Sequence, residues 1–165
     1  MCLMALTIRT TISCSDKEDG IGGGSETLGT YVDLGLSSGT KWKTLNEKND
    51  ADAEYDFFTY DEAVSRFGNR LPTIEQWKEL KSECQWSWTG SGYKVTAPNG
   101  NSISLPAAGC RDFYGRVYGR GSSGGYWSST PNGSDGAWYL RFHSGSVNDG
   151  NDSRGYGRSV RLVQD

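Results

Sequence analysis

The C-terminal third of the sequence lacks several common residue types. Residues 111–160 contain no Lys, Glu, Gln, Met, Ile or Cys. All seven lysines of the chain lie at or before Lys94, whereas seven of its ten arginines lie at or after Arg111. Gly, Ser, Asn, Asp, Arg, Tyr and Trp take the place of the missing types. Tyr, Trp and Arg dominate binding hot spots, and Ser, Gly and Asn make adaptable polar contacts, so this composition favours a recognition surface.

Histidine, closely spaced cysteines and long apolar runs are also scarce. His143 is the only histidine, and none of the four cysteines forms a C-x-x-C pair. These absences disfavour a zinc site and a Ser-His triad. No run approaches the roughly 20 apolar residues of a membrane-spanning helix. The net charge of −3 argues against nucleic acid as a partner. We therefore expect no metal, no cofactor and no nucleic-acid partner.

Residues 1–29 lack the patterning of a folded domain and are predicted to be a leader followed by a flexible tether. Residues 11–14, Thr-Ile-Ser-Cys, resemble the lipobox of bacterial lipoproteins, in which the cysteine is lipidated. The acidic run at residues 15–19 resembles the export signal of surface lipoproteins in Bacteroidetes-type bacteria. The resemblance implies a lipid anchor at Cys14 and an outer-membrane lipoprotein at the cell surface. A leader without function is the alternative.

Residues 30–165 are predicted to form a single α+β domain that starts with a hairpin and two helices. Apolar and polar residues alternate over residues 31–36 and 41–45, which predicts the hairpin. Thr59, followed by Glu62 and then Gly68, predicts a capped helix. Thr73 is expected to start the second helix, which buries Trp77, Leu80 and Cys84 on one face.

The remaining apolar runs are predicted to be strands. Residues 93–96 and 102–105 flank an Asn-Gly turn and predict a second hairpin. Residues 86–88, 125–129, 137–142 and 159–163 are expected to be further strands, separated by long Gly/Ser/Asn loops. The predicted core of this region is Tyr126, Trp127, Leu140, Phe142, Val160 and Leu162.

Five segments together resemble one known family. They are YVDLGLSSGTKW (31–42), RLPTIEQWKEL (70–80), GYKVTAPNGNSISLPAAG (92–109), YWSST (126–130) and SVRLV (159–163). This combination resembles the Fibrobacter succinogenes major paralogous domain family. The resemblance implies a secreted or surface-anchored bacterial protein, usually without an assigned activity.

The Arg-Leu-Pro-Thr-x-x-x-Trp segment is also similar to the formylglycine-generating enzyme (sulfatase-modifying factor) group. That similarity implies a C-type-lectin-like fold, with two helices packed on small twisted antiparallel sheets and long loops that present variable residues. The oxidase activity of that group needs a pair of copper-binding cysteines near the C-terminal end of the fold, and no cysteine follows Cys110. Cys84 and Cys110 are expected to be either a buried disulfide or two inert thiols.

Candidate ligand-binding residues fall into two groups. The first is one predicted loop, with Arg111, Asp112, Tyr114, Arg116, Tyr118 and Arg120. The second follows it and comprises Tyr139, Arg141, His143, Asn148, Asp149, Asn151, Asp152, Arg154 and Tyr156. Alternation along residues 138–143 places Trp138, Leu140 and Phe142 on a core face, and Tyr139, Arg141 and His143 on a surface face.

Residues 148–152, Asn-Asp-Gly-Asn-Asp, offer the oxygen ligands that calcium prefers. Polar residues around a glycine are more typical of a turn than of a cation site. We therefore predict a turn here and no metal.

The composition of residues 111–160 has one sharper explanation, a diversity-generating retroelement. Randomising two adenines of an asparagine codon can yield Arg, Asp, Gly, Ser, Tyr, His or Asn, but never Lys, Glu, Gln, Met or Trp. The first four of these are absent from the segment, and Trp127 and Trp138 would then belong to the scaffold. An ordinary Gly/Ser/Asn-rich loop region would share the bias, so both explanations stay open.

These observations predict a non-enzymatic, surface-exposed binding module of adhesin or receptor type, with a protein or glycan ligand. It would meet the membrane only through a lipid anchor. The alternatives are a formylglycine-generating-enzyme-like oxidase, disfavoured by the missing cysteine pair, and a structural subunit of a surface assembly such as a pilus tip.

Overall fold

A computed structural model describes residues 29–52 and 54–165. The predicted lipidation site Cys14 and most of the predicted tether lie outside these residues. The described chain has an α+β fold with two α-helices and several small antiparallel sheets, as predicted. The helices are α1 (Tyr60–Phe67) and α2 (Ile74–Glu83), and short 3-10 turns η1 (Asp50–Asp52) and η2 (Gly68–Arg70) precede and follow α1. Neither α-helix is long and apolar enough to cross a membrane.

Both helices start where the sequence predicts. Thr59 caps α1 and Thr73 caps α2, and each threonine side chain accepts a hydrogen bond from a backbone N–H three residues on. The residues at those positions, Glu62 and Gln76, reach back to the cap, so both helices begin with a capping box. Gly68 ends α1 with φ of +53°, a conformation that glycine adopts without the steric cost of a Cβ.

The strands form four groups in the described chain. β1 (Tyr31–Asp33), β2 (Lys41–Lys43) and β11 (Val163–Gln164) make one sheet, in the order β1-β2-β11. β3 (Gln85–Trp88), β4 (Gly92–Thr96) and β5 (Ser102–Pro106) make the second. β6 (Cys110–Arg111) and β7 (Val117–Tyr118) form a short hairpin. β8 (Ser123–Asn132), β9 (Gly136–His143) and β10 (Ser146–Ser153) make the longest sheet, with β9 in the centre.

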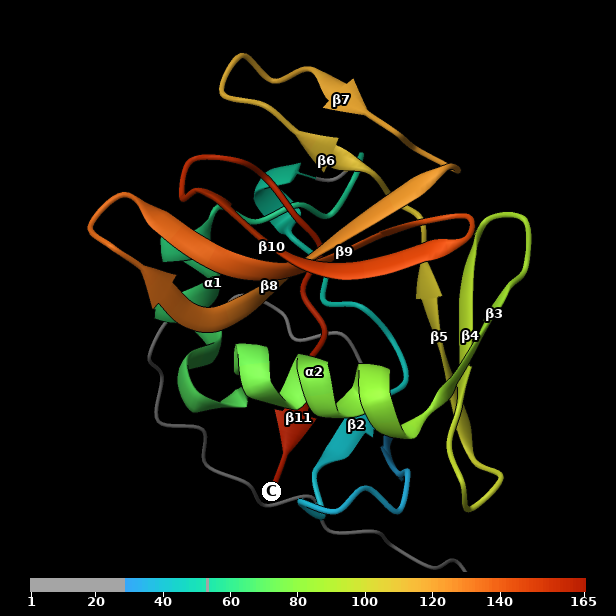
Figure 1. The fold of residues 1–165 in the computed structure, drawn as a ribbon. Helices are drawn as coiled ribbons and strands as arrows, with labels where there is room; N and C mark the ends of the chain where they lie inside the picture. The colour runs from blue at the N-terminus through green and yellow to red at the C-terminus, as the bar shows by residue number, and fades with distance from the viewer. Residues whose placement is uncertain (1–28, 53) are drawn as a thin grey trace, which may run out of the picture.

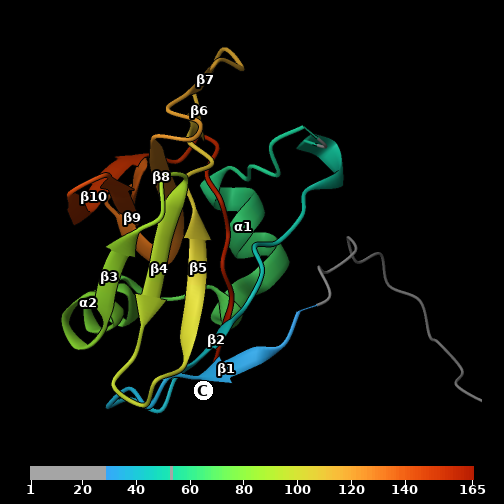
Figure 2. The ribbon, with the colours of Figure 1, turned by 90° about the vertical axis from the view of Figure 1, so that its right-hand side faces the viewer.

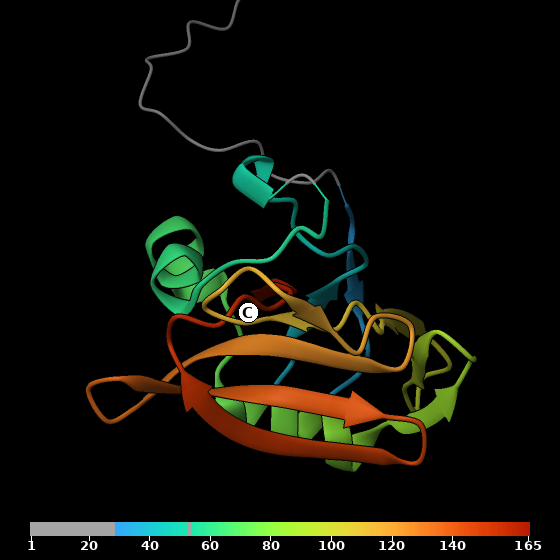
Figure 3. The same ribbon diagram turned by 90° about the horizontal axis from the view of Figure 1, so that it is seen from above.

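The elements are stacked in layers. Figure 1 shows the β6–β7 hairpin at one end and β2 with β11 at the other, with the β8–β10 sheet and α2 between them. Seen from above, the green α2 runs beneath the orange and red strands of the β8–β10 sheet (Figure 3). The β3–β5 sheet stands beside these layers and spans much of their height (Figure 2). One face of the β8–β10 sheet is therefore covered by α2, and the other faces the hairpin.

Two aromatic cores lie between these layers. The first surrounds α2 and includes Trp42, Trp77, Tyr126, Leu140 and Phe142. The second surrounds α1 and includes Phe58, Phe67, Trp127, Val160 and Leu162. All six residues predicted as the core of the C-terminal third are buried. The predicted hairpins at β1–β2 and β4–β5 are confirmed, with Asn99 and Gly100 in the turn of the second.

Three predictions about secondary structure are wrong. Residues 148–152 are not a turn but part of β10, which pairs with β9 along its whole length. The predicted loop at residues 111–120 contains the β6–β7 pairing. The predicted strand at residues 159–163 is reduced to Val163 at the start of β11. Ser159 pairs with Tyr126 of β8 in an isolated bridge, and Val160 and Leu162 are buried in the second core.

Candidate functional site

The pairing within the β8–β10 sheet decides which candidate residues share a face. Arg141 pairs with Asn148, and His143 pairs with Ser146. Directly paired residues project to the same side of a sheet, so all four side chains lie on the face away from α2. Leu140 pairs with Asp149, so Asp149 lies on the α2 face. There its carboxylate forms an ion pair with the ammonium of Lys81 at 2.7 Å. The ion pair and the N–H donated by the Lys81 ammonium lower the pKa of Asp149.

We call the face of the β8–β10 sheet that points away from α2 the open face. An arginine from the C-terminal segment covers one half of it. The Arg158 guanidinium carbon lies 3.5 Å from the centroid of the Tyr139 ring and 5.0 Å from that of Trp127. Arg158 also donates to Asp152 at 2.7 Å and is only 3% exposed. Tyr139 beneath it is 8% exposed. The alternation along β9 is confirmed, but the prediction that Tyr139 lies on the surface is wrong, because Arg158 covers it.

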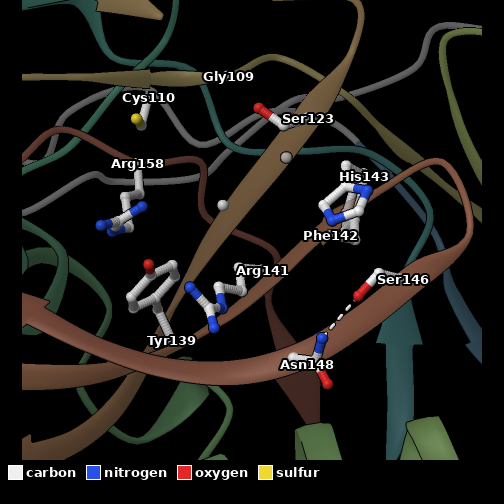
Figure 4. A pocket seen from close by; sticks show the side chains of 12 residues that line it. Gly109, Cys110, Ser123, Tyr139, Arg141, Phe142, His143, Ser146, Asn148 and Arg158 are labelled. Carbon is white, nitrogen blue, oxygen red and sulfur yellow. Dashed lines mark hydrogen bonds between the residues drawn. The ribbon is translucent and has the colours of Figure 1, made fainter. Parts of the chain in front are cut away.

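The other half of the face forms a pocket of about 300 Å³. Figure 4 shows Arg158 beside Tyr139 on one side of the pocket, with Arg141 and His143 further along β9. Asn148 and Ser146 of β10 contribute one rim, and their side chains are hydrogen-bonded at 2.7 Å. The complete lining is Gly109, Cys110, Ser123, Gly124, Gly125, Tyr139, Arg141, Phe142, His143, Ser146, Asn148 and Arg158.

Glycines allow close packing around the pocket. A Cβ at Gly125 would lie 2.7 Å from Nη1 of Arg158, and a Cβ at Gly124 would overlap the ring of Phe142. Gly109 has φ of +84°, and a Cβ there would collide with the backbone of β7. The absence of a side chain at these three positions lets Arg158, Phe142 and the end of β7 pack this closely around the pocket.

The lining contains two arginines and one histidine, and no Asp or Glu. Because Asp152 balances the charge of Arg158, the positive charge available to a ligand is that of Arg141. Within the described chain, the guanidinium of Arg141 forms no hydrogen bond or ion pair. Nδ1 of His143 lies 3.0 Å from the carbonyl oxygen of Ser144. Because a carbonyl only accepts, Nδ1 carries the proton in this contact and Nε2 is left for a ligand.

The first group of candidates lies on the β6–β7 hairpin and divides into structural and exposed residues. Arg111 forms an ion pair with Asp52 at 2.7 Å, and Arg120 lies over the ring of Tyr55 at 5.0 Å. Asp112 organises the turn by accepting hydrogen bonds from the backbone N–H groups of Tyr114 and Arg116 and from the hydroxyl of Tyr118. Partial desolvation raises the pKa of Asp112, but these hydrogen bonds outweigh it, so the pKa is lowered.

The tip of the hairpin is the most exposed aromatic surface in the described chain. Tyr114 is 84% exposed, Tyr118 51% and Phe113 58%. Arg116 lies over the ring of Tyr114, 5.8 Å from its centroid. None of the first group of candidates lines the pocket.

Five members of the second group are not pocket residues either, among them Asp149, which is paired with Lys81 on the α2 face. Asn151 pairs with Trp138 on the α2 face. Arg154 donates to the carbonyl oxygens of Gly133 and Gly136, each at 3.1 Å, and Tyr156 packs on Phe113. Asp152 is the ion-pair partner of Arg158. The structure thus brings together only Tyr139, Arg141, His143 and Asn148 of the second group.

The sequence did not single out Arg158, Ser123 or Ser146 as site residues. Arg158 follows Tyr156 and Gly157 in a segment without regular alternation of apolar and polar residues. No sequence pattern there predicts that Arg158 stacks on Tyr139. Ser123 and Ser146 are placed by the β8–β9–β10 register, which follows only once β10 is known to be a strand.

Cys84 and Cys110 are free thiols, so the alternative of a disulfide between them is wrong. Cys84 packs against the first core, where burial raises its pKa to about 11. Its thiolate is therefore scarce near neutral pH. Cys110 lines the pocket. No group of three or more His, Cys, Asp or Glu side chains in residues 29–52 and 54–165 is arranged to hold a metal ion.

Comparison with known proteins gives one match. Residues 88–163 match the model of a family described as a domain of unknown function (DUF8237). Every residue that lines the pocket lies within the matched segment. No curated protein and no solved structure matches the chain.

Proposed function

We propose that this protein is a non-enzymatic binding module and that the pocket over β8, β9 and β10 is its ligand site. The observation that carries the proposal is Arg141, a charged side chain that lines a pocket and has no partner within the described chain. Concave sites with a few convergent polar groups are the usual form of ligand sites. His143 and Asn148 supply two more such groups from neighbouring positions of the same sheet face.

The proposal also covers the type of α+β fold and the cellular location of the protein. Two helices, small antiparallel sheets and a glycine-rich C-terminal third support a C-type-lectin-like fold. The lipobox-like residues 11–14 support display at the cell surface through Cys14. Labelling with a fatty-acid probe tests the anchor, because label that persists in Cys14→Ser would contradict it.

Diversification by a retroelement remains part of this proposal for the exposed positions only. Arg158 and Tyr139 are buried against each other, so random replacement there would damage the fold. A near-copy of the 3′ coding sequence beside a reverse-transcriptase gene would support diversification, and its absence from the surrounding DNA would contradict it.

The binding proposal is tested with an array of glycans and cell-surface proteins. Arg141→Ala and His143→Ala are expected to abolish or strongly weaken binding of the selected ligand. Lys41→Ala is the matched control, because Lys41 is exposed on β2, at the far end of the molecule from the β6–β7 hairpin (Figure 1). Binding that ignores both pocket variants would contradict the proposed site. Copper-dependent oxidation of a peptide cysteine would contradict the non-enzymatic assignment.

A further inference from the structure

The charge of the pocket narrows the class of ligand. The chain as a whole carries a net charge of −3, yet the pocket lining contains two arginines, one histidine and no carboxylate. Arg141 is exposed, and its charge is not offset by any hydrogen bond or ion pair within the described chain. A guanidinium placed in this way matches a carboxylate, which it can bind through two parallel N–H···O bonds.

Arg158 forms a fixed wall on one side of the pocket. It is held between Asp152 and the ring of Tyr139, so its position does not depend on a ligand. Its Nε–H is buried and has no acceptor among residues 29–52 and 54–165. Asp152 balances the charge of this guanidinium, so Arg158 shapes one side of the pocket and Arg141 supplies the positive charge that attracts an anion.

The other lining groups suit hydroxyls. The Asn148 Nδ2 donates to Oγ of Ser146, which leaves Oδ1 of Asn148 to accept from a ligand hydroxyl. Oγ of Ser123 lies on the opposite strand of the same face, paired across from His143. A ligand that satisfies the whole lining needs one anionic group and several hydroxyl groups.

The size and position of the pocket favour a sugar over a peptide. Its volume of about 300 Å³ lies at the lower end of the range for small-molecule sites. Peptides that add to a sheet need an open strand edge. This pocket instead lies over the face of the sheet and is bounded by Gly109 and Cys110 at the start of the hairpin.

We propose that the pocket binds a carboxylate-bearing sugar residue, with Arg141 as the principal partner of the carboxylate. This inference rests on the proposed function and names the ligand class of the same site. Arg158 forms one wall of the pocket, and His143, Asn148 and Ser123 contact the hydroxyls.

The test is an NMR titration of the 15N-labelled full chain with D-glucuronate and with D-glucose, its neutral counterpart. Glucuronate is expected to shift the amide resonances of Arg141, His143 and Ser146, and glucose is expected to leave them unchanged. Arg141→Gln should weaken glucuronate binding about tenfold or more, because a charge-assisted pair is lost. Arg141→Lys, which keeps the charge, should weaken it less, and Lys41→Gln should not change it.

Three outcomes would overturn the inference. Equal shifts with glucose would remove the requirement for a carboxylate. Equal or tighter binding of N-acetyl-L-glutamate at the same residues would make the ligand a peptide acid. No shift with glucuronate would reject the sugar acid. In each case the array experiment decides the proposed function separately. The proposed function stands if binding of a ligand from the array depends on Arg141 and His143. If binding of no array ligand depends on them, the proposed function is rejected together with the inference.

Discussion

The two halves of the open face of the β8–β10 sheet use arginine in opposite ways. In the closed half, Arg158 is buried between Tyr139, Trp127 and Asp152 and completes the second core. In the open half, Arg141 points into a pocket and has no partner within the described chain. Both arginines belong to the same Arg-rich C-terminal third, yet one supports the fold and the other remains available for a ligand. Their contacts, rather than the composition of the segment, distinguish the structural arginine from the binding arginine.

The closed half should carry most of the stability, and Trp127→Ala tests this with the largest expected effect. The indole is fully buried, its Nε1–H donates to the carbonyl oxygen of Phe58 at 2.8 Å, and it packs on Tyr60 and Tyr139. We expect a loss of about 3–5 kcal/mol in the free energy of unfolding, measured by urea denaturation. A loss below about 1 kcal/mol would show that the second core does not depend on this residue.

Gly124→Ala tests the boundary between the pocket floor and the first core. A Cβ at this position overlaps the ring of Phe142, which must move within a packed core. We expect a loss of about 1–3 kcal/mol, measured in the same way. Ser144→Ala, at an exposed position in the turn after β9, is the control and should change the free energy of unfolding little. The neighbouring Gly145 is unsuitable, because its φ of +82° would strain any residue with a Cβ.

A matched pair of arginine variants sharpens the comparison itself. Arg158→Met removes the stacking on Tyr139 and leaves Asp152 without its partner, so we expect a loss of about 1–3 kcal/mol in the free energy of unfolding. Arg141→Met removes no such contact and should change stability by less than about 0.5 kcal/mol. Equal losses from the two variants would refute the division of the face into a structural and a binding half.

The smallest effect is expected at the tip of the hairpin. Tyr114 is 84% exposed, so Tyr114→Ala should change the free energy of unfolding by less than about 0.5 kcal/mol. It should also leave the affinity for a pocket ligand unchanged, because Tyr114 does not line the pocket. A large loss of affinity would move the binding surface from the pocket to the hairpin.

Local sequence signals predicted the parts of the fold that depend on local contacts. The capping boxes at Thr59 and Thr73 and the Asn99-Gly100 turn need only neighbouring residues, and all three are present. β10 was missed because its sequence, Ser-Val-Asn-Asp-Gly-Asn-Asp-Ser, has no apolar alternation. Its strand conformation comes from pairing with β9 and from the Lys81–Asp149 ion pair, which are tertiary contacts.

The candidate site could be predicted only in part for the same reason. Alternation along β9 placed Arg141 and His143 on the correct face, and both line the pocket. It could not show that Arg158, which lies 19 residues after Tyr139, would cover that ring. Nor could composition separate the pocket from the hairpin, since both are rich in Arg, Tyr and Gly.

The most direct test of the central claim is to map the bound ligand on the protein by amide chemical-shift changes, using the ligand that the array selects. We predict the largest changes at Arg141, His143, Ser146 and Asn148, which line the open half of the sheet face. Changes confined to residues 112–118 of the hairpin, with the pocket resonances unmoved, would contradict the account.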